Sequence, residues 1–119
     1  MKTFSLWTIA AVCFVTLASA AQARSAYDGS WDLNFVTQTG SCDPSYNFTV
    51  NISEGIVTHP NLVKFTGYVA KSGSVRASVT VHDKFASGTG RLFGTTGRGR
   101  WNGRAGSARC TGYWIAQRN

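Results

Sequence analysis

The sequence predicts an all-β fold, a small antiparallel meander that closes into a barrel of about eight short strands. Three observations support this fold class. Apolar and polar residues alternate with a period of two in several segments, as expected for strands that bury one face. Turn-forming residues recur at roughly eight- to twelve-residue spacing. Beyond residue 23, no segment carries the sustained apolar stripe of a helix. A small β-sandwich is the alternative that the same pattern allows.

The first 23 residues have the pattern of a secretory signal peptide. A cationic residue precedes an apolar run from Phe4 to Leu17, and small residues follow this run at two cleavage-site triplets. A membrane-spanning helix needs about 20 apolar residues, and this run is shorter. We therefore expect cleavage after Ala20 or Ala23 and a single β-barrel-like domain over residues 24–119. The mature protein is expected to be secreted or periplasmic, with no transmembrane segment.

Four segments of the mature chain alternate between apolar and polar residues. Each places its apolar side chains on one face of a half-buried antiparallel strand. The four segments lie at residues 31–35, 46–52, 63–69 and 75–81. Turn signals rich in Gly, Pro, Asn, Asp and Ser separate them.

The last third of the chain is rich in glycine. Eight glycines lie between Gly88 and Gly112, and residues 88–92 are echoed by residues 97–101, which predicts two successive short strands. Glycine inside strands indicates bulges, sharp bends or close backbone approach. Asn102-Gly103 is typical of a hairpin turn, because both residues tolerate positive φ. Residues 110–118 are expected to form a strand with both faces largely covered. A flexible tail is the alternative, which the aromatic residues disfavour.

Two cysteines remain once the leader, with Cys13, is removed. In an exported protein, Cys42 and Cys110 are expected to form a disulfide. Closing so long a loop stabilises a fold by about 4 kcal/mol in the chain-entropy model. Two cysteines without a nearby cluster of ligands make a poor zinc site.

The two ends of the mature chain carry a family resemblance. Gly29-Ser30-Trp31, paired with Arg118 near the last residue, resembles the calycin pattern of lipocalins and avidins. In that pattern a basic side chain of the final strand covers the G-x-W tryptophan. The resemblance implies that Trp31 packs beneath Arg118 and ties the first strand to the last. A longer set of residues, from Tyr27 through Cys42 to Trp114, resembles small exported bacterial proteins without an established function. Neither resemblance implies an activity.

Catalytic chemistry has little support in the sequence. The histidines are His59 and His82, and the mature chain has five acidic side chains with no spacing typical of paired catalytic carboxylates. The chain lacks a nucleophile elbow, a P-loop and a dinucleotide-binding fingerprint. We therefore predict a protein that is not an enzyme, with no catalytic residues, metal or cofactor.

Positive charge is concentrated toward the C-terminus. The full chain has 12 Lys and Arg against 5 acidic residues, a net charge of +7. Removing Lys2 with the leader leaves 11 against 5, a net charge of +6. From Lys84 to the end there are seven Lys or Arg residues and no acidic side chain.

This distribution predicts a surface that binds an anionic polymer. The predicted contacts are Arg91, Arg98, Arg100 and Arg104, with Trp101 as stacking partner. The expected partners are anionic polysaccharide or lipopolysaccharide; no nucleic acid is expected, because export separates the protein from it. Alternatively, the arginines only solubilise the barrel and the tryptophans form its core. A protease-inhibitor-like barrel and a small-ligand carrier with an apolar cavity are the other function classes that remain open.

The intact mass of the exported protein tests the leader and the disulfide together. We expect the mature chain to begin at Ala21 or Arg24 and to gain the mass of two hydrogens on reduction. A mass that already corresponds to two free thiols before reduction contradicts the bridge.

Overall fold

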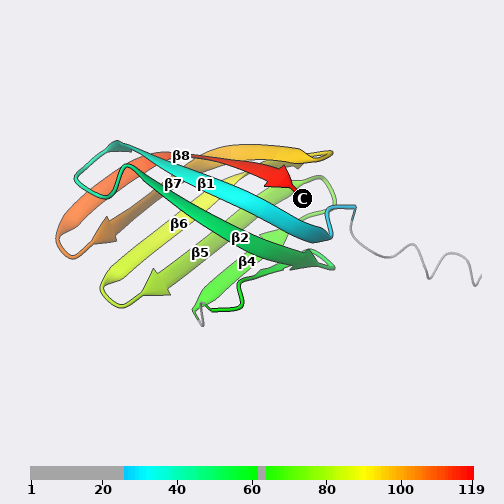
Figure 1. Ribbon diagram of the computed structural model, residues 1–119, viewed down its shortest axis with the longest axis horizontal. Helices are drawn as coiled ribbons and strands as arrows, with labels where there is room; N and C mark the ends of the chain where they lie inside the picture. Colours follow the sequence, from blue (N-terminus) through cyan, green and yellow to red (C-terminus); the bar gives the residue numbers. More distant parts are fainter. Residues whose placement is uncertain (1–25, 62–63) are drawn as a thin grey trace, which may run out of the picture.

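Eight antiparallel strands follow one another around a closed barrel (Figure 1). The computed structural model describes residues 26–61 and 64–119; the predicted signal peptide, residues 1–23, lies outside the described residues. The strands are β1 (Gly29–Thr39), β2 (Ser45–Ser53), β3 (Ile56–Thr58), β4 (Phe65–Val69), β5 (Ser74–Val81), β6 (Lys84–Phe93), β7 (Thr96–Ala105) and β8 (Ala108–Arg118). Their order around the barrel is their order along the chain, and β1 pairs with β8. The predicted all-β meander is confirmed as a barrel.

The period-two alternation positions the core. Along β2, the apolar residues of alternate positions face the interior, and Val50 and Ile52 are buried while their polar neighbours are exposed. The buried hydrophobic residues are Trp31, Val50, Ile52, Val57, Val69, Leu92, Trp101, Cys110, Trp114 and Ala116. Within the described residues, no polar or charged side chain is buried. In this part of the chain, no helix is long and apolar enough to cross a membrane.

The glycines of the last third make room for two tryptophans inside the barrel. A Cβ atom on Gly99 would meet the carbonyl oxygen of Thr89 and lie 2.5 Å from the Trp114 ring. On Gly112 it would lie 2.8 Å from the indole nitrogen of Trp101. Real side chains do not approach so closely, so a larger residue at either position displaces a tryptophan or a strand. The predicted close backbone approach is confirmed.

The predicted hairpin at Asn102-Gly103 is wrong, because both residues lie within β7. Gly103 is required by strand contact: its Cβ would lie 2.9 Å from the Cα of Ala86 on β6. The two-residue turns of this region begin at Gly94 and Gly106, which both have positive φ, 57° and 61°. The echo between residues 88–92 and 97–101 does correspond to two successive strands, β6 and β7.

Arg118 fastens the seam between β1 and β8 at one end of the barrel. Its guanidinium carbon lies 5.3 Å from the centroid of the Trp31 ring. Its Nη2 atom donates hydrogen bonds to the carbonyl oxygens of Ala26, at 2.8 Å, and Asp28, at 2.6 Å. The Trp31 indole donates in turn to the carbonyl of Tyr27, at 2.8 Å. The expected contact between Trp31 and Arg118 is confirmed.

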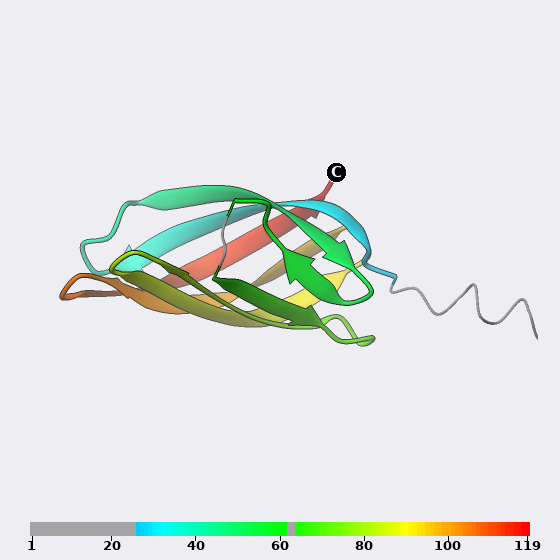
Figure 2. The same ribbon diagram turned by 90° about the horizontal axis from the view of Figure 1, so that it is seen from below.

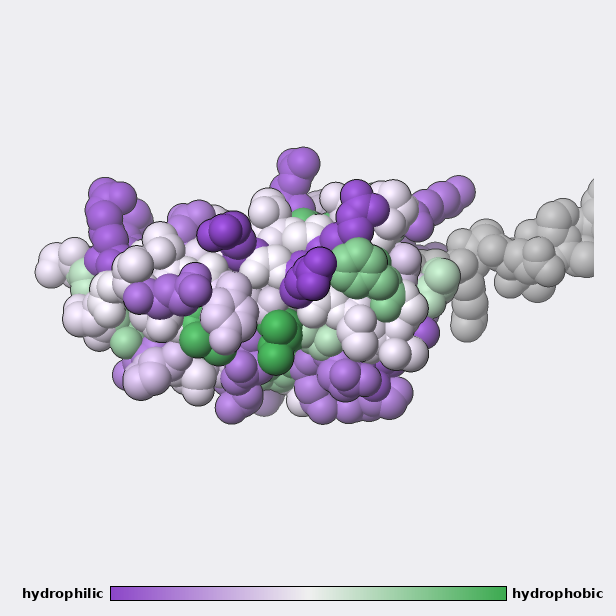
Figure 3. Space-filling model, turned by 90° about the horizontal axis from the view of Figure 1, so that it is seen from above, coloured by the Kyte–Doolittle hydropathy of each residue, from purple (hydrophilic) through white to green (hydrophobic). Residues whose placement is uncertain are grey.

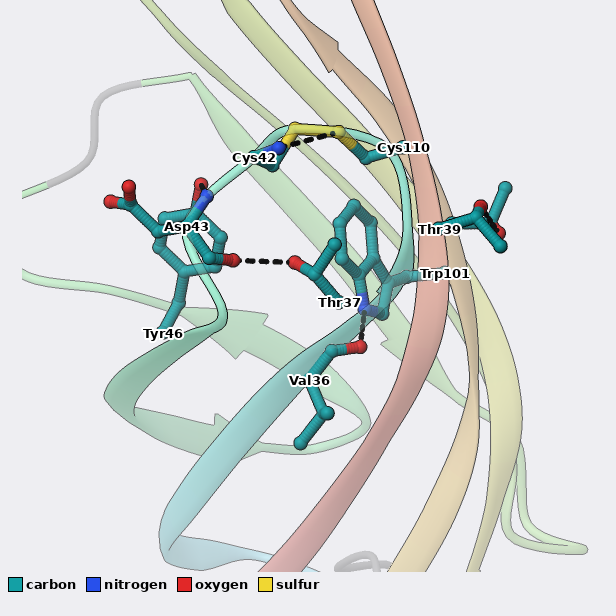
Figure 4. The surroundings of a disulfide bond; sticks show 9 residues. Val36, Thr37, Thr39, Cys42, Asp43, Tyr46, Trp101 and Cys110 are labelled. Carbon is teal, nitrogen blue, oxygen red and sulfur yellow. Dashed lines mark hydrogen bonds between the residues drawn. A yellow bond between two sulfur atoms is a disulfide. The ribbon is translucent and has the colours of Figure 1, made fainter.

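The disulfide fastens the same seam at the opposite end (Figure 4). Cys42, in the loop between β1 and β2, is bonded to Cys110 of β8, with their Cα atoms 6.2 Å apart. The loop is also held by the Thr37 hydroxyl, which donates to the Asp43 carbonyl at 2.6 Å. Gly40 has a φ of 97°, and a Cβ there would lie 2.7 Å from the Cys110 sulfur. The predicted disulfide is confirmed.

The opposite wall of the barrel has less strand pairing. β3 has three residues and is among the short green strands of Figure 2. Its register with β4 has one residue pair, Ile56 with Tyr68, beside a hydrogen bond from the Val69 amide to the Gly55 carbonyl at 2.7 Å. Both ends of the described chain lie at the Arg118 end (Figure 1). Closure of the barrel therefore depends chiefly on the long pairing of β1 with β8.

Replacing Arg118 by alanine should lower the free energy of unfolding by about 1–3 kcal/mol. The change removes the ring contact and two hydrogen bonds. In a domain of this size, each kcal/mol corresponds to a fall of about 4–8 °C in melting temperature. The control is Arg76→Ala on β5, because Arg76 is exposed and makes no hydrogen bond or ion pair within the described residues. Equal melting of the two variants contradicts the role of Arg118 in closure.

Replacing Gly99 by alanine should destabilise the barrel by about 2 kcal/mol through overpacking against Trp114. The control is Gly94→Ala, where a Cβ meets no atom within 4 Å and the cost, about 1 kcal/mol, is that of the positive φ alone. Near-ultraviolet circular dichroism separates the two, since only Gly99→Ala is expected to alter the tryptophan signal. An unchanged signal for Gly99→Ala contradicts the packing argument.

Candidate functional site

Three of the predicted arginines, Arg91, Arg98 and Arg100, lie together on the outer surface of the barrel because of strand alternation. Along β7, Gly97 and Gly99 face the interior, so that Arg98 and Arg100 project outward. Arg91 of β6 lies directly opposite Arg98 in the register of these strands. Residues paired in this way have Cα atoms about 4.5–5.5 Å apart, so the two guanidinium groups share one patch of surface.

Arg76, which the sequence analysis did not select, joins the same patch. In the register of β4 to β8, one row across the outer surface contains Tyr68, Arg76, Thr89, Arg100 and Tyr113. Arg76 is therefore two strands from Arg100 and adjacent to the strand that carries Arg91. We call the surface formed by Arg76, Arg91, Arg98 and Arg100 the basic face.

The arginines of the basic face have few partners. Arg91 donates to the carbonyl of Ser72 at 3.3 Å, and the Arg98 guanidinium lies 5.7 Å from the Phe93 ring centroid. Arg76 and Arg100 make no hydrogen bond or ion pair with the described residues. Each of these side chains is exposed.

Acidic side chains lie around the basic face and not within it. Strands β5 to β8 contain no Asp or Glu. Asp83 occupies the turn between β5 and β6, at the end with the disulfide loop. Asp32, on β1, accepts hydrogen bonds from Thr49 at 2.9 Å and from Asn119 at 3.3 Å. The basic face therefore has one sign of charge across three strands, β5 to β7.

The structure separates two predicted residues from this surface. Trp101 is 5% exposed, and its indole donates to the carbonyl of Val36 inside the wall at 3.1 Å, so it is not available to stack on a ligand outside the barrel. It is adjacent to Arg100 in sequence and therefore points to the other side of β7. Arg104 faces outward but lies toward the disulfide end, opposite Arg109 and 5.8 Å from the Phe85 ring centroid.

Exposed aromatic and aliphatic side chains border the basic face. Tyr68 and Tyr113 are 63% and 39% exposed, and Ile115 is 49% exposed. The expectation that both faces of β8 are covered is therefore wrong, because only its inner face packs in the core. Figure 3 shows hydrophilic side chains spread over the side where β8 lies, with small hydrophobic patches between them.

The histidines occupy structural positions. His59 packs edge-on against Phe48, with ring centroids 6.0 Å apart, and its Nδ1 accepts a hydrogen bond from the Asn61 amide at 3.1 Å. His82 has a φ of 56° in the turn between β5 and β6. Across residues 26–61 and 64–119, no three His, Cys, Asp or Glu side chains gather where they would hold a metal ion.

Comparisons with known proteins assign no family. No family model, no curated protein and no solved structure matches the chain.

Proposed function

We propose that the chain is an exported binding protein whose basic face holds an anionic envelope or extracellular polymer, such as an acidic polysaccharide or lipopolysaccharide. The observation that carries the proposal is the direct opposition of Arg91 and Arg98 on neighbouring strands, beside Arg100 and on strands that contain no acidic residue. Like charges directly opposite each other destabilise a sheet. A polyanion relieves this repulsion, because it supplies the counter-charges that the barrel lacks.

The row that crosses the basic face suits an extended ligand. Tyr68 and Tyr113 lie at its two ends, with Arg76 and Arg100 between them. Four strand spacings separate the tyrosines, roughly 19 Å along the wall. Exposed tyrosine rings offer flat apolar surface beside a hydroxyl, which suits the apolar face of a sugar ring. In this proposal the tyrosines replace Trp101 as stacking partners.

Export and a calycin-like relationship belong to the same proposal. A disulfide between Cys42 and Cys110 favours an oxidising compartment such as the periplasm or the extracellular space. An eight-stranded meander in which Arg118 covers Trp31 supports a calycin-like origin. The acidic polymer is then one that the exported protein meets outside the cytoplasm.

Removing two arginines should weaken binding of an acidic polysaccharide and flatten its salt dependence. For Arg98→Ala/Arg100→Ala, the slope of log affinity against log salt should fall by roughly one unit per arginine. The oxidised protein is titrated against an acidic polysaccharide, lipopolysaccharide and a neutral glucan between low and physiological ionic strength.

A matched variant distinguishes the basic face from net charge. Lys64→Ala/Arg109→Ala removes the same two charges from exposed positions outside the basic face and should retain most of the binding. Equal losses in the two double variants contradict the proposal, as does a neutral glucan that binds as tightly as the acidic polymers. Tyr113→Ala should weaken the polysaccharide without changing the salt slope.

A further inference from the structure

The interior of the barrel contains two adjoining apolar cavities. The inner cavity, about 70 Å³, lies beside Trp31 and Leu92, toward the Arg118 end. The outer cavity, about 130 Å³, extends toward Tyr46 and the disulfide at the other end. Both have Leu33, Phe35, Phe65, Val79 and Ala86 in their walls. The two cavities therefore form one column along the barrel.

The deep part of this column is apolar: the hydroxyl residues in its lining are Ser78 and Ser87, whose side chains point to the outer face because their neighbours Ala77 and Ala86 face the interior. The described core contains no buried polar or charged side chain. The indole N–H groups of Trp101 and Trp114 donate to the carbonyls of Val36, at 3.1 Å, and Thr89, at 3.2 Å. Because these donors are already paired, an occupant of the deep column must be apolar.

The column has its mouth at the disulfide end. Val81, which faces the interior as Val79 does, lines the outer cavity and is 36% exposed, so the wall of this cavity reaches the surface there. At the other end Trp31 is 1% exposed beneath Arg118, which is bonded to the backbone of residues 26–28. An occupant therefore enters past the β5–β6 turn and the disulfide loop.

Two cations lie at this mouth, and the carboxylates of Asp43 and Asp83, in the two loops that border it, do not line the outer cavity. Lys84 and Arg104 line the outer cavity, whose described lining contains no acidic residue. Arg104 projects from the outer face of β7 at the rim of this opening, where its guanidinium carbon lies 5.8 Å from the Phe85 ring centroid. Neither cation forms an ion pair with an acidic side chain of the described residues. An anionic group at the mouth is attracted by both cations, while the rest of the same molecule is buried in the column.

We propose that the barrel binds one short anionic amphiphile, with an unbranched alkyl chain in the column and a carboxylate or sulfate group at Lys84 and Arg104. The narrow apolar column selects the chain, and the cationic mouth selects the sign of the head. This site is separate from the basic face, because Arg104 belongs to the mouth and the arginines of the basic face do not line either cavity.

Titration calorimetry with alkyl carboxylates of six to twelve carbons, below their micelle concentrations, tests the proposal on the unmodified protein. Affinity should rise by roughly fourfold per added methylene until the column is full, with one ligand per barrel. The alcohol of the same chain length should bind more weakly, and the alkyl trimethylammonium ion more weakly still. An affinity that is independent of chain length, or a cation that binds as well as the carboxylate, overturns the proposal.

Two double variants then locate the head group. Lys84→Gln/Arg104→Gln should weaken the carboxylate by roughly five- to tenfold and leave the alcohol unchanged. Arg98→Gln/Arg100→Gln, which removes the same charge from the basic face, should leave both ligands unchanged. Equal weakening by the two double variants shows that the ligand responds to net charge, and the site at the mouth is then rejected.

Discussion

The pairing of the first strand with the last is the constraint on which the rest of the barrel depends. β1 and β8 are in register from Trp31 to Thr39, with one irregularity, and this seam closes the cylinder. Arg118 secures it at one end by covering Trp31, and the disulfide secures it at the other. The pairing of β3 with β4 is the weakest in the described barrel, with one residue pair in register and a hydrogen bond from the Val69 amide to the Gly55 carbonyl. The same two fastenings define the column inside, since Arg118 closes one end and the disulfide loop borders the mouth.

One sequence pattern produces both the core and the charged surface of the C-terminal strands. In β7, glycine alternates with arginine from Gly97 to Arg100, so that each glycine turned inward places an arginine outside. Gly99 is needed because Trp114 lies where its side chain would project, and Gly97 is needed because Leu92 lies where its own would project. The arginines make the outer face of β7 polar, although the inner face of this strand carries few side chains. The same alternation therefore has two linked consequences. It makes room for a large indole inside a narrow barrel, and it concentrates positive charge on the outside.

Local sequence patterns predict most strands of this protein, and the features that they do not predict depend on the register between strands far apart in the sequence. Alternation places β1, β2, β4 and β5, and elimination among the cysteines identifies the disulfide. The prediction of Trp101 as a surface stacking partner is wrong, although its adjacency to Arg100 in a strand already places the two side chains on opposite faces. Arg76 offered no such signal, because its position beside the other arginines follows only from the pairing of β5 with β6. Asn102-Gly103 has the local chemistry of a turn, but contact with Ala86 across the strands requires the glycine in mid-strand.

The disulfide both cross-links the fold and borders the outer cavity. Cys42 lines the outer cavity, and its backbone amide lies 3.1 Å from the Cys110 sulfur, so the loop that borders the mouth is positioned by the bridge itself. The bond restricts the unfolded chain across 68 residues, which is its contribution to global stability. In the folded state it also holds that loop against β8, with the Thr37 hydroxyl as a second contact. The Arg118 end is held independently of the disulfide, because its contacts are the Trp31 ring and the hydrogen bonds of Arg118 to the backbone.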